Sequence, residues 1–344
     1  MTAYFIRRFL LIIPTFIGIT VMVFTITRLV PGGPIERIIV QAQQMHNAGG
    51  GGGTSAMSAS EQSQPLSEDQ LEELKKYYGF DKPLLHSYFL WLGKVLTGDL
   101  GTSTRYYDPV WMMIKERIPI SLYFGILSMF LIYSVCIPLG IAKAVRHKSG
   151  FDNISSLIVF IGYAIPGWVA GVLLLMLFSS HWEIFPLGGL ISDEFDDFSL
   201  WEQAWDILRH TVLPLTSYVI GSFTVMTFLM KNTLMDNLAS DYVRTAIAKG
   251  LSFRKAVFAH ALRNSLIPIA THFGNNISVL LMGSFLIETV FNIDGMGLLG
   301  YESVIERDYP VVLGILVISS LLLMLGNILS DICVALTDPR VRFQ

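Results

Sequence analysis

One apolar stretch of the sequence carries three polar side chains whose types and spacing could serve chemistry. His272, Asn275 and Asn276 fall at positions i, i+3 and i+4, so they share one face of a helix. An unpartnered amide costs several kcal/mol in hydrocarbon, so this face must meet protein or water. Two interpretations are open: the side chains line a path for a polar solute, or they fasten this stretch to its neighbours by hydrogen bonds.

The motifs on which common hydrolytic and nucleotide sites are built do not occur in the sequence. It contains no GxxxxGK[ST] loop to hold phosphates, no HExxH zinc helix and no GxSxG nucleophile turn. Cys136 and Cys333 both fall in apolar stretches, which favours a packing role over a disulfide or a metal site. We therefore expect no catalytic residue, no metal ligand and no cofactor bound by this chain.

Composition predicts a membrane protein. Of the 344 residues, 52% are hydrophobic and only 15% are charged, which is too apolar for a soluble domain of this size. A formal net charge of -3 gives no basis for nucleic-acid binding. The expected fold class is an all-α integral membrane protein.

Six apolar segments have about the 20 residues that a helix needs to cross a bilayer core. They cover residues 9–30, 118–142, 154–178, 211–230, 265–291 and 310–336. Basic residues gather in loop 143–153, in segment 231–264 and near the C-terminus, while loop 179–210 is acidic. The positive-inside rule therefore places the basic loops and both termini in the cytoplasm, with Arg7 and Arg8 ahead of the first span.

The spans divide the chain into three parts. Residues 1–30 hold the N-terminal end and the first span, and residues 118–344 hold the other five spans with the cytoplasmic loop 231–264. Between them, residues 31–117 are expected to form a large extracytoplasmic region. Within that region, residues 45–64 are rich in Gly, Ser and Gln, which indicates a flexible insertion.

Two local patterns add detail to the spans. In GYAIPGW, residues 162–168, Pro166 removes a helical hydrogen bond, which predicts a kink. Tyr163 and Pro166 are candidates for the lining of a translocation path, with a kink that serves packing alone as the alternative. Ser199 and Glu202 form a capping box, which predicts a short helix carrying Trp201 and Trp205 as aromatic anchors at the membrane interface, with a docking site for a soluble partner as the alternative.

The segment between the fourth and fifth spans, residues 240–268, reads SDYVRTAIAKGLSFRKAVFAHALRNSLIP and is too polar to cross a membrane. Ser240 or Asp241 can cap a first helix, Gly250 can end it with a left-handed backbone, and Ser252 can cap a second. The apolar faces expected are Tyr242, Val243, Ala246 and Ile247 in the first helix, and Phe253, Val257, Phe258 and Ala261 in the second. A bent, basic elbow of this kind suits docking into a groove of a soluble partner.

This elbow resembles the cytoplasmic coupling loop of ABC importer permeases. Arg244-Thr245-Ala246 stands for the Glu-Ala-Ala triplet of that loop, Gly250 for its glycine, and His260 to Arg263 for its closing Ile-x-Leu-Pro. Arg in place of the Glu and of the Pro is usual in the peptide-transport branch. Segments 79–103, 288–314 and 338–342 are also similar to peptide permeases. The Gly-rich insertion, together with GYAIP, FPLGGL and LLGYES, most resembles Yej-type B permeases.

The resemblance implies a type I ABC importer permease fold with six transmembrane helices and a large periplasmic region. It implies one transmembrane subunit of an ATP-driven importer for oligopeptides or peptide-like compounds such as microcin C, located in the bacterial inner membrane. The residues expected to couple to the ATPases are Arg244, Thr245, Ala246, Gly250, Leu251, Ser252, His260 and Arg263.

The same resemblance implies a set of partners. They are a second permease subunit in a heterodimer, two ABC ATPase domains or subunits that bind ATP and Mg, a periplasmic peptide-binding protein, and membrane lipid. The spacing of the sequence also allows a homodimer. Two other classes compete: an intramembrane hydrolase, which lacks a nucleophile beside a base, and a passive scaffold, which leaves the elbow unexplained.

Overall fold

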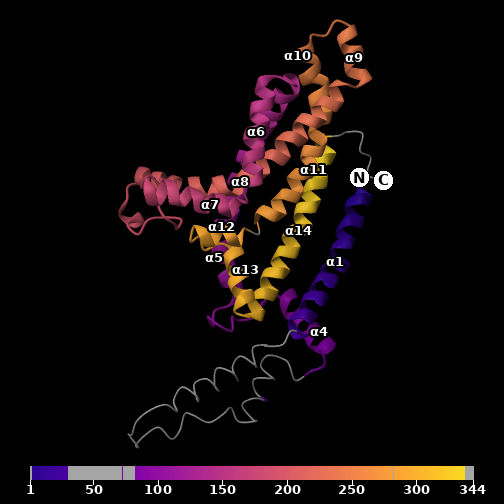
Figure 1. Cartoon of the computed structure of the whole chain (residues 1–344). Coiled ribbons are helices and arrows are strands. Elements are labelled where there is room, and N and C mark those ends of the chain that lie inside the picture. Colours follow the sequence, from indigo (N-terminus) through magenta and orange to yellow (C-terminus); the bar gives the residue numbers. More distant parts are fainter. Residues whose placement is uncertain (1, 30–71, 73–81, 282, 338–344) are drawn as a thin grey trace, which may run out of the picture. The chain divides into compact units, whose positions relative to one another are not determined.

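The computed structural model describes residues 2–29, 72, 82–281 and 283–337 (Figure 1). The side chains of residues 2–9, 29, 274–281, 334, 336 and 337 lie outside this description. The Gly-rich insertion predicted at 45–64, most of the region 31–117 that contains it, and the tail at 338–342 also fall outside it. Within the described ranges the regular structure is helical, in agreement with the expected all-α class.

The chain divides into two compact units. The first consists of Met1–Ile12, Glu116–Leu299 and Leu321–Gln344, and the second of Ile13–Lys115 and Gly300–Ser320. Helices α1 (Thr2–Leu29), α5 (Val110–Val145), α13 (Met296–Ile305) and α14 (Tyr309–Thr337) belong partly to each unit.

Four helices in the described part of the chain are long and apolar enough to cross a membrane: α1, α5, α8 (Leu200–Leu238) and α14. A fifth span results if α6 (Gly150–Ala164) and the bent segment Gly167–His181 are counted together. The predicted fifth span, 265–291, is divided between α11 (Leu262–Leu281) and α12 (Phe285–Val290), and α11 is not among the helices that pass this test. The polar residues that make this stretch unusual also lower its hydropathy.

The third predicted span is broken rather than kinked. α6 and the segment formed by α7 (Gly167–Leu174) and the π-helical turn Leu175–His181 meet at 93°. Pro166 has no N–H to donate and disfavours helical backbone at the residue before it, and Ile165 is accordingly extended, with φ -100° and ψ 119°. A Cβ on Gly167 would lie 2.5 Å from the carbonyl oxygen of Ser217, so only glycine allows α7 to cross α8 this closely.

The capping box at Ser199 is present, but the short helix predicted after it is not a separate element. The Glu202 carboxylate accepts the N–H of Ser199 at 2.9 Å, and α8 then continues without a break to Leu238. The prediction of a separate helix was wrong because residues 203–210 contain no Gly or Pro to end it. Trp201 and Trp205 are exposed on its first turns.

α8 is the central helix of the first unit. It packs against α6, α7, α11 and α12. The core around it includes Met230 and Leu234 of α8 with Ile132 of α5 and Ile269 of α11. A Cβ on Gly140 of α5 would lie 2.6 Å from the Met230 Cβ, so this glycine lets α5 approach α8 closely.

Three charged side chains are buried where α5, α6 and α8 meet, and we call Lys143, Asp152 and Lys231 the buried charge node. Lys231 Nζ donates to both carboxylate oxygens of Asp152, at 2.7 and 2.8 Å. Lys143 Nζ lies 3.1 Å from Asp152 Oδ1 and also donates to the hydroxyls of Ser155 and Ser156. One carboxylate thus holds two ammonium groups from different helices.

In the second unit, a loop is fixed by a buried carboxylate. Asp308, just before α14, accepts the Thr104 N–H at 3.0 Å and a hydrogen bond from the Ser103 hydroxyl. The same loop contains Tyr107, which is 81% exposed and has a φ of 61°. A bulky residue with positive φ is strained, and it persists here because the loop around it is held on both sides.

We expect Tyr107→Gly to stabilise the protein. Left-handed backbone costs an L residue about 1–2 kcal/mol, and Tyr107→Gly removes this cost. Glycine loses more backbone entropy on folding, which offsets about half of the gain, so the net stabilisation is about 0.5–1 kcal/mol. Thermal unfolding in detergent measures it as a raised midpoint. Tyr106→Gly is the control, because φ is not positive at Tyr106, and there the midpoint should fall. Equal effects at both positions would contradict the strain at Tyr107.

Candidate functional site

The segment 240–268 forms the bent elbow that the sequence predicts. α9 (Asp241–Ala248) is followed by a turn, then by α10 (Phe253–Ala256) and a π-helical turn, Val257–Ala261, that leads into α11. Gly250 has a φ of 94°, and its N–H donates to the carbonyl of Ile247 at 2.9 Å. Figure 1 shows α9 and α10 as two short helices at the end of the long helices α8 and α11.

Both helices of the elbow begin at the serines expected to cap them. Ser240 and Ser252 occupy the N-cap positions with extended backbone, and Asp241 is the first helical residue. Neither serine makes the capping bond with its side chain, and the Ser240 hydroxyl donates instead to the carbonyl of Asn237.

The buried face of the elbow consists largely of small or branched side chains. Val243, Ala256, Val257 and Ala261 are buried in the core that contains Leu234 of α8. This face is buried because the small side chains of Ala256 and Ala261 let the elbow approach α8 closely.

The predicted apolar faces were therefore only half right. Phe253 and Phe258 do not share the buried face of Val257 and Ala261, and Phe258 is 57% exposed. Tyr242 and Ile247 of α9 are exposed as well. These four side chains form the apolar surface of the elbow. An exposed apolar surface of this kind is typical of a site that binds another protein.

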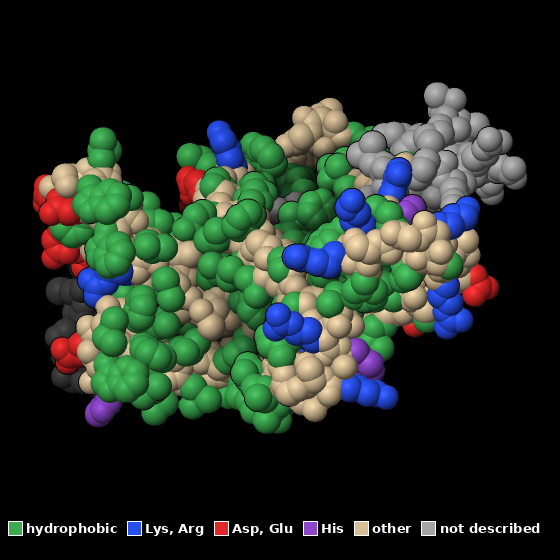
Figure 2. Space-filling model, turned by 90° about the horizontal axis from the view of Figure 1, so that it is seen from above, with side chains coloured by type: hydrophobic (Ala, Val, Ile, Leu, Met, Phe, Trp, Pro, Cys, Tyr) green, Lys and Arg blue, Asp and Glu red, His purple; other side chains and the backbone are tan. Residues whose placement is uncertain are grey.

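Basic side chains accompany this apolar surface. Those that are exposed are Arg244, Lys249, Arg254, Lys255 and Arg263. Figure 2 looks down on this end of the molecule, where Lys and Arg side chains gather around hydrophobic ones. Of the residues expected to couple to an ATPase, the exposed ones are Arg244, Thr245, Gly250, Ser252, His260 and Arg263, while Ala246 and Leu251 are half-buried.

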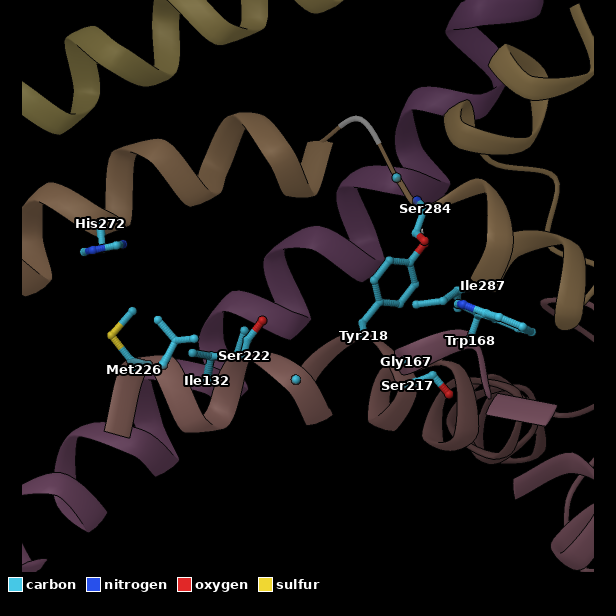
Figure 3. Close-up of a pocket in the computed structure, with 13 residues that line it drawn as sticks. Ile132, Gly167, Trp168, Ser217, Tyr218, Ser222, Met226, His272, Ser284 and Ile287 are labelled. Carbon is cyan, nitrogen blue, oxygen red and sulfur yellow. Dashed lines mark hydrogen bonds between the residues drawn. The ribbon is translucent and has the colours of Figure 1, made fainter. Parts of the chain in front are cut away.

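A groove of about 520 Å³ lies farther along α8 (Figure 3). It is lined from α8 by Ser217, Tyr218 and Ser222, from α7 by Trp168, and from α11 by His272. The residues that line it include no Asp, Glu, Lys or Arg. This lining suits a ligand that is recognised by a few polar and aromatic contacts.

The sequence-based candidates for a translocation path are only partly brought together. His272 lines the groove, and Trp168 follows the candidate Pro166 by two residues. Tyr163 is exposed on α6 and is not part of the lining, nor is Pro166. The side chains of Asn275 and Asn276 lie outside the described residues.

Sequence reasoning missed Tyr218 and Ser284 as groove residues. A usable signal existed in α8, where Ser217, Tyr218, Gly221 and Ser222 lie at helical spacing inside an apolar span. Small and polar residues in such a span face other helices or water rather than lipid.

An exposed basic elbow and a groove beside a broken helix are compatible with a transport subunit. Residues 136–343 match the family described as the inner membrane component of binding-protein-dependent transport systems. The chain belongs to this family, and it is a multi-pass inner-membrane transport permease. The sequence-based resemblance to Yej-type peptide permeases is thereby confirmed.

Relatives with known names support the same class. The chain is 39% identical to the inner membrane ABC transporter permease protein YejB of Escherichia coli O157:H7, over the full length of both. It is 38% identical to the peptidoglycan transport system permease protein YejB of Agrobacterium fabrum, over 100% of this chain and 99% of that protein. Identity to the dipeptide transport system permease protein DppB of Escherichia coli K12 is 33%, again over both full lengths.

Proposed function

We propose that this chain is one of two transmembrane subunits of an ATP-driven importer that carries oligopeptides or peptide-like compounds, microcin C among them, into the cytoplasm. The relatives named for peptide, dipeptide and peptidoglycan transport support a peptidic substrate. The observation that carries the proposal is the apolar surface of the elbow, which packs against α8 by its other face and carries exposed basic side chains. Aromatic anchors surrounded by charge are typical of protein interfaces.

In this proposal the elbow transmits the state of the ATPases to the spans. ATP and Mg bind the partner ATPases. ATP can shift the permease between two states only by the difference in its binding free energy for the two states of the assembled complex. A stiff contact is needed to transmit this free-energy difference to the spans. In the proposal this contact is formed by Arg244, Thr245, Ala246, Gly250, Leu251, Ser252, His260 and Arg263. The small and branched buried residues of α9, α10 and the π-helical turn pack this contact against α8.

The topology proposed for the family member has six spans with both termini and the elbow in the cytoplasm. α11 and α12 together supply the fifth span, and residues 31–117 lie in the periplasm. A second permease completes the pathway, and a periplasmic peptide-binding protein delivers the substrate. Trp168 and His272 in the groove, with the candidates Tyr163, Pro166, Asn275 and Asn276 nearby in sequence, belong to the proposed translocation path.

Phe258→Glu tests the elbow as the ATPase contact. We expect the tagged protein to recover about tenfold less ATPase from mild detergent, because the change places a charge in the centre of an apolar interface. Unfolding should be little affected, since the ring is exposed. Leu200→Glu, which is also exposed but lies at the start of α8, is the matched control and should leave recovery unchanged. Absence of any ATPase or second permease with the native chain would refute the proposed function.

A further inference from the structure

The first unit contains a buried carboxyl group, that of Glu288, which has no role in the functions described above. Glu288 of α12 is only 1% exposed, and no Lys, Arg or His forms a salt bridge with it among the described residues. An ionisable group buried in a membrane protein is costly, so its environment indicates what it serves.

The surroundings of Glu288 are built to hold a carboxylate. Oε2 accepts the N–H of Leu298 at 2.7 Å, and Oε1 accepts the N–H of Ser284 at 3.2 Å. A Cβ on Gly295 would lie 2.6 Å from the carboxyl group, and one on Gly283 would lie closer still, so glycines make room for it. Both oxygens of the carboxyl group thus accept hydrogen bonds from backbone N–H groups, and the N–H of Ser284 is shared with the Tyr218 hydroxyl.

Tyr218 connects this carboxylate to the groove. Its hydroxyl donates to Glu288 Oε1 at 3.3 Å and accepts the N–H of Ser284 at 3.2 Å. The ring stacks on Phe124, with the ring centroids 5.8 Å apart, so its position is fixed. A hydroxyl oxygen has two lone pairs, and one remains for a ligand in the groove that Tyr218 lines (Figure 3).

The groove therefore contains a strengthened hydrogen-bond acceptor in a lining without charged side chains. Donation to a carboxylate strengthens the hydroxyl oxygen as an acceptor. Trp168 lines the same groove and is exposed, and its ring face also attracts cations.

We propose that Tyr218, backed by Glu288, is the acceptor for the α-ammonium group of a peptide as it passes through the groove. This inference rests on the proposed function and names the chemical class of group that the groove selects. A main-chain ammonium is common to free peptides of every sequence. An acceptor of this kind fits a groove whose lining contains no Asp, Glu, Lys or Arg.

Photo-crosslinking in the assembled importer tests this assignment. The complex, with its ATPases, second permease and binding protein, is held in nanodiscs with a non-hydrolysable ATP analogue. Tripeptides carrying a diazirine leucine at residue 1 or at residue 3 are then illuminated, and the labelled fragments are identified by mass spectrometry. We expect the residue 1 probe to label fragments that contain Trp168 or Tyr218.

The variants separate the hydroxyl from the charge. Tyr218→Phe keeps the ring and is expected to reduce this labelling about fivefold, and Glu288→Gln, which keeps the hydroxyl, should do the same. Tyr123→Phe is the matched control: its hydroxyl also makes a hydrogen bond, at 2.8 Å to Thr211, but it does not line the groove. Labelling by the residue 3 probe should be unaffected throughout.

Two results would overturn the assignment while leaving the importer intact. They are unchanged labelling in Tyr218→Phe, or labelling by the residue 1 probe outside the groove in a native complex that transports peptide. A native complex without peptide-dependent uptake or ATP hydrolysis is a different outcome, since it would refute the proposed function and the assignment together.

Discussion

Gly250→Val is expected to reduce peptide transport per ATP hydrolysed about tenfold while the ATPases remain bound. The φ of 94° at this position is unfavourable for any side chain and most so for a β-branched one. No atom lies within 4 Å of a Cβ placed there, so the cost arises from the backbone alone. The turn can relax only by changing φ, and that change would reorient α9 against α10.

Uptake of labelled peptide and ATP hydrolysis, measured in the same proteoliposomes, give the ratio. Gly98→Val is the matched control, because Gly98 also has a positive φ, 85°, with no atom within 4 Å of an added Cβ. It should cost comparable stability and leave the ratio unchanged. Gly250→Asn should be intermediate, since Asn tolerates left-handed backbone. A native ratio in Gly250→Val would show that the elbow does not need this conformation.

Asp152→Asn is expected to lower the free energy of unfolding by about 3–5 kcal/mol, the usual loss when one partner of a buried ion pair is removed. The reason is the buried charge node. Without the carboxylate, the ammonium groups of Lys143 and Lys231 both remain buried with no anion between them. Chemical unfolding in detergent measures the loss as a shift of the midpoint.

The double variant Asp152→Asn with Lys231→Met restores the original net charge of the node and should recover about 2 kcal/mol of the loss. Asp294→Asn provides the surface comparison. Asp294 pairs with Arg117 at 2.7 Å but its side chain is 62% exposed, so the change should cost less than about 1 kcal/mol. Equal losses at Asp152 and Asp294, or no recovery in the double variant, would contradict the role of the node.

Local chemistry explains which features could be predicted from the sequence. Gly250 predicts the bend of the elbow because a left-handed backbone depends on one residue, and Ser252 takes the predicted N-cap position, although its side chain makes no capping bond. Pro166 likewise indicates a break, although its angle depends on how closely Gly167 lets α7 approach α8. Composition was enough for the all-α membrane class.

Features that depend on distant residues could not be predicted in the same way. Lys143 and Lys231 are 88 positions apart, and Tyr218 and Glu288 are 70 apart, so neither grouping leaves a periodic signal. The predicted orientation of Phe253 and Phe258 was wrong for a related reason. Hydrophobicity placed the rings inside, but the packing distance to α8 favoured the alanines on the neighbouring face.

The break in the third span has a mechanical consequence. α6 and α7 are stiff rods, and the joint between them consists of Ile165 and Pro166. The ring of Pro166 fixes one of the four backbone torsions in this joint. Rotation of one rod against the other can therefore use only the three that remain, and it breaks no hydrogen bond inside either helix. Such a joint restricts any rotation of α6 against α7 to few directions.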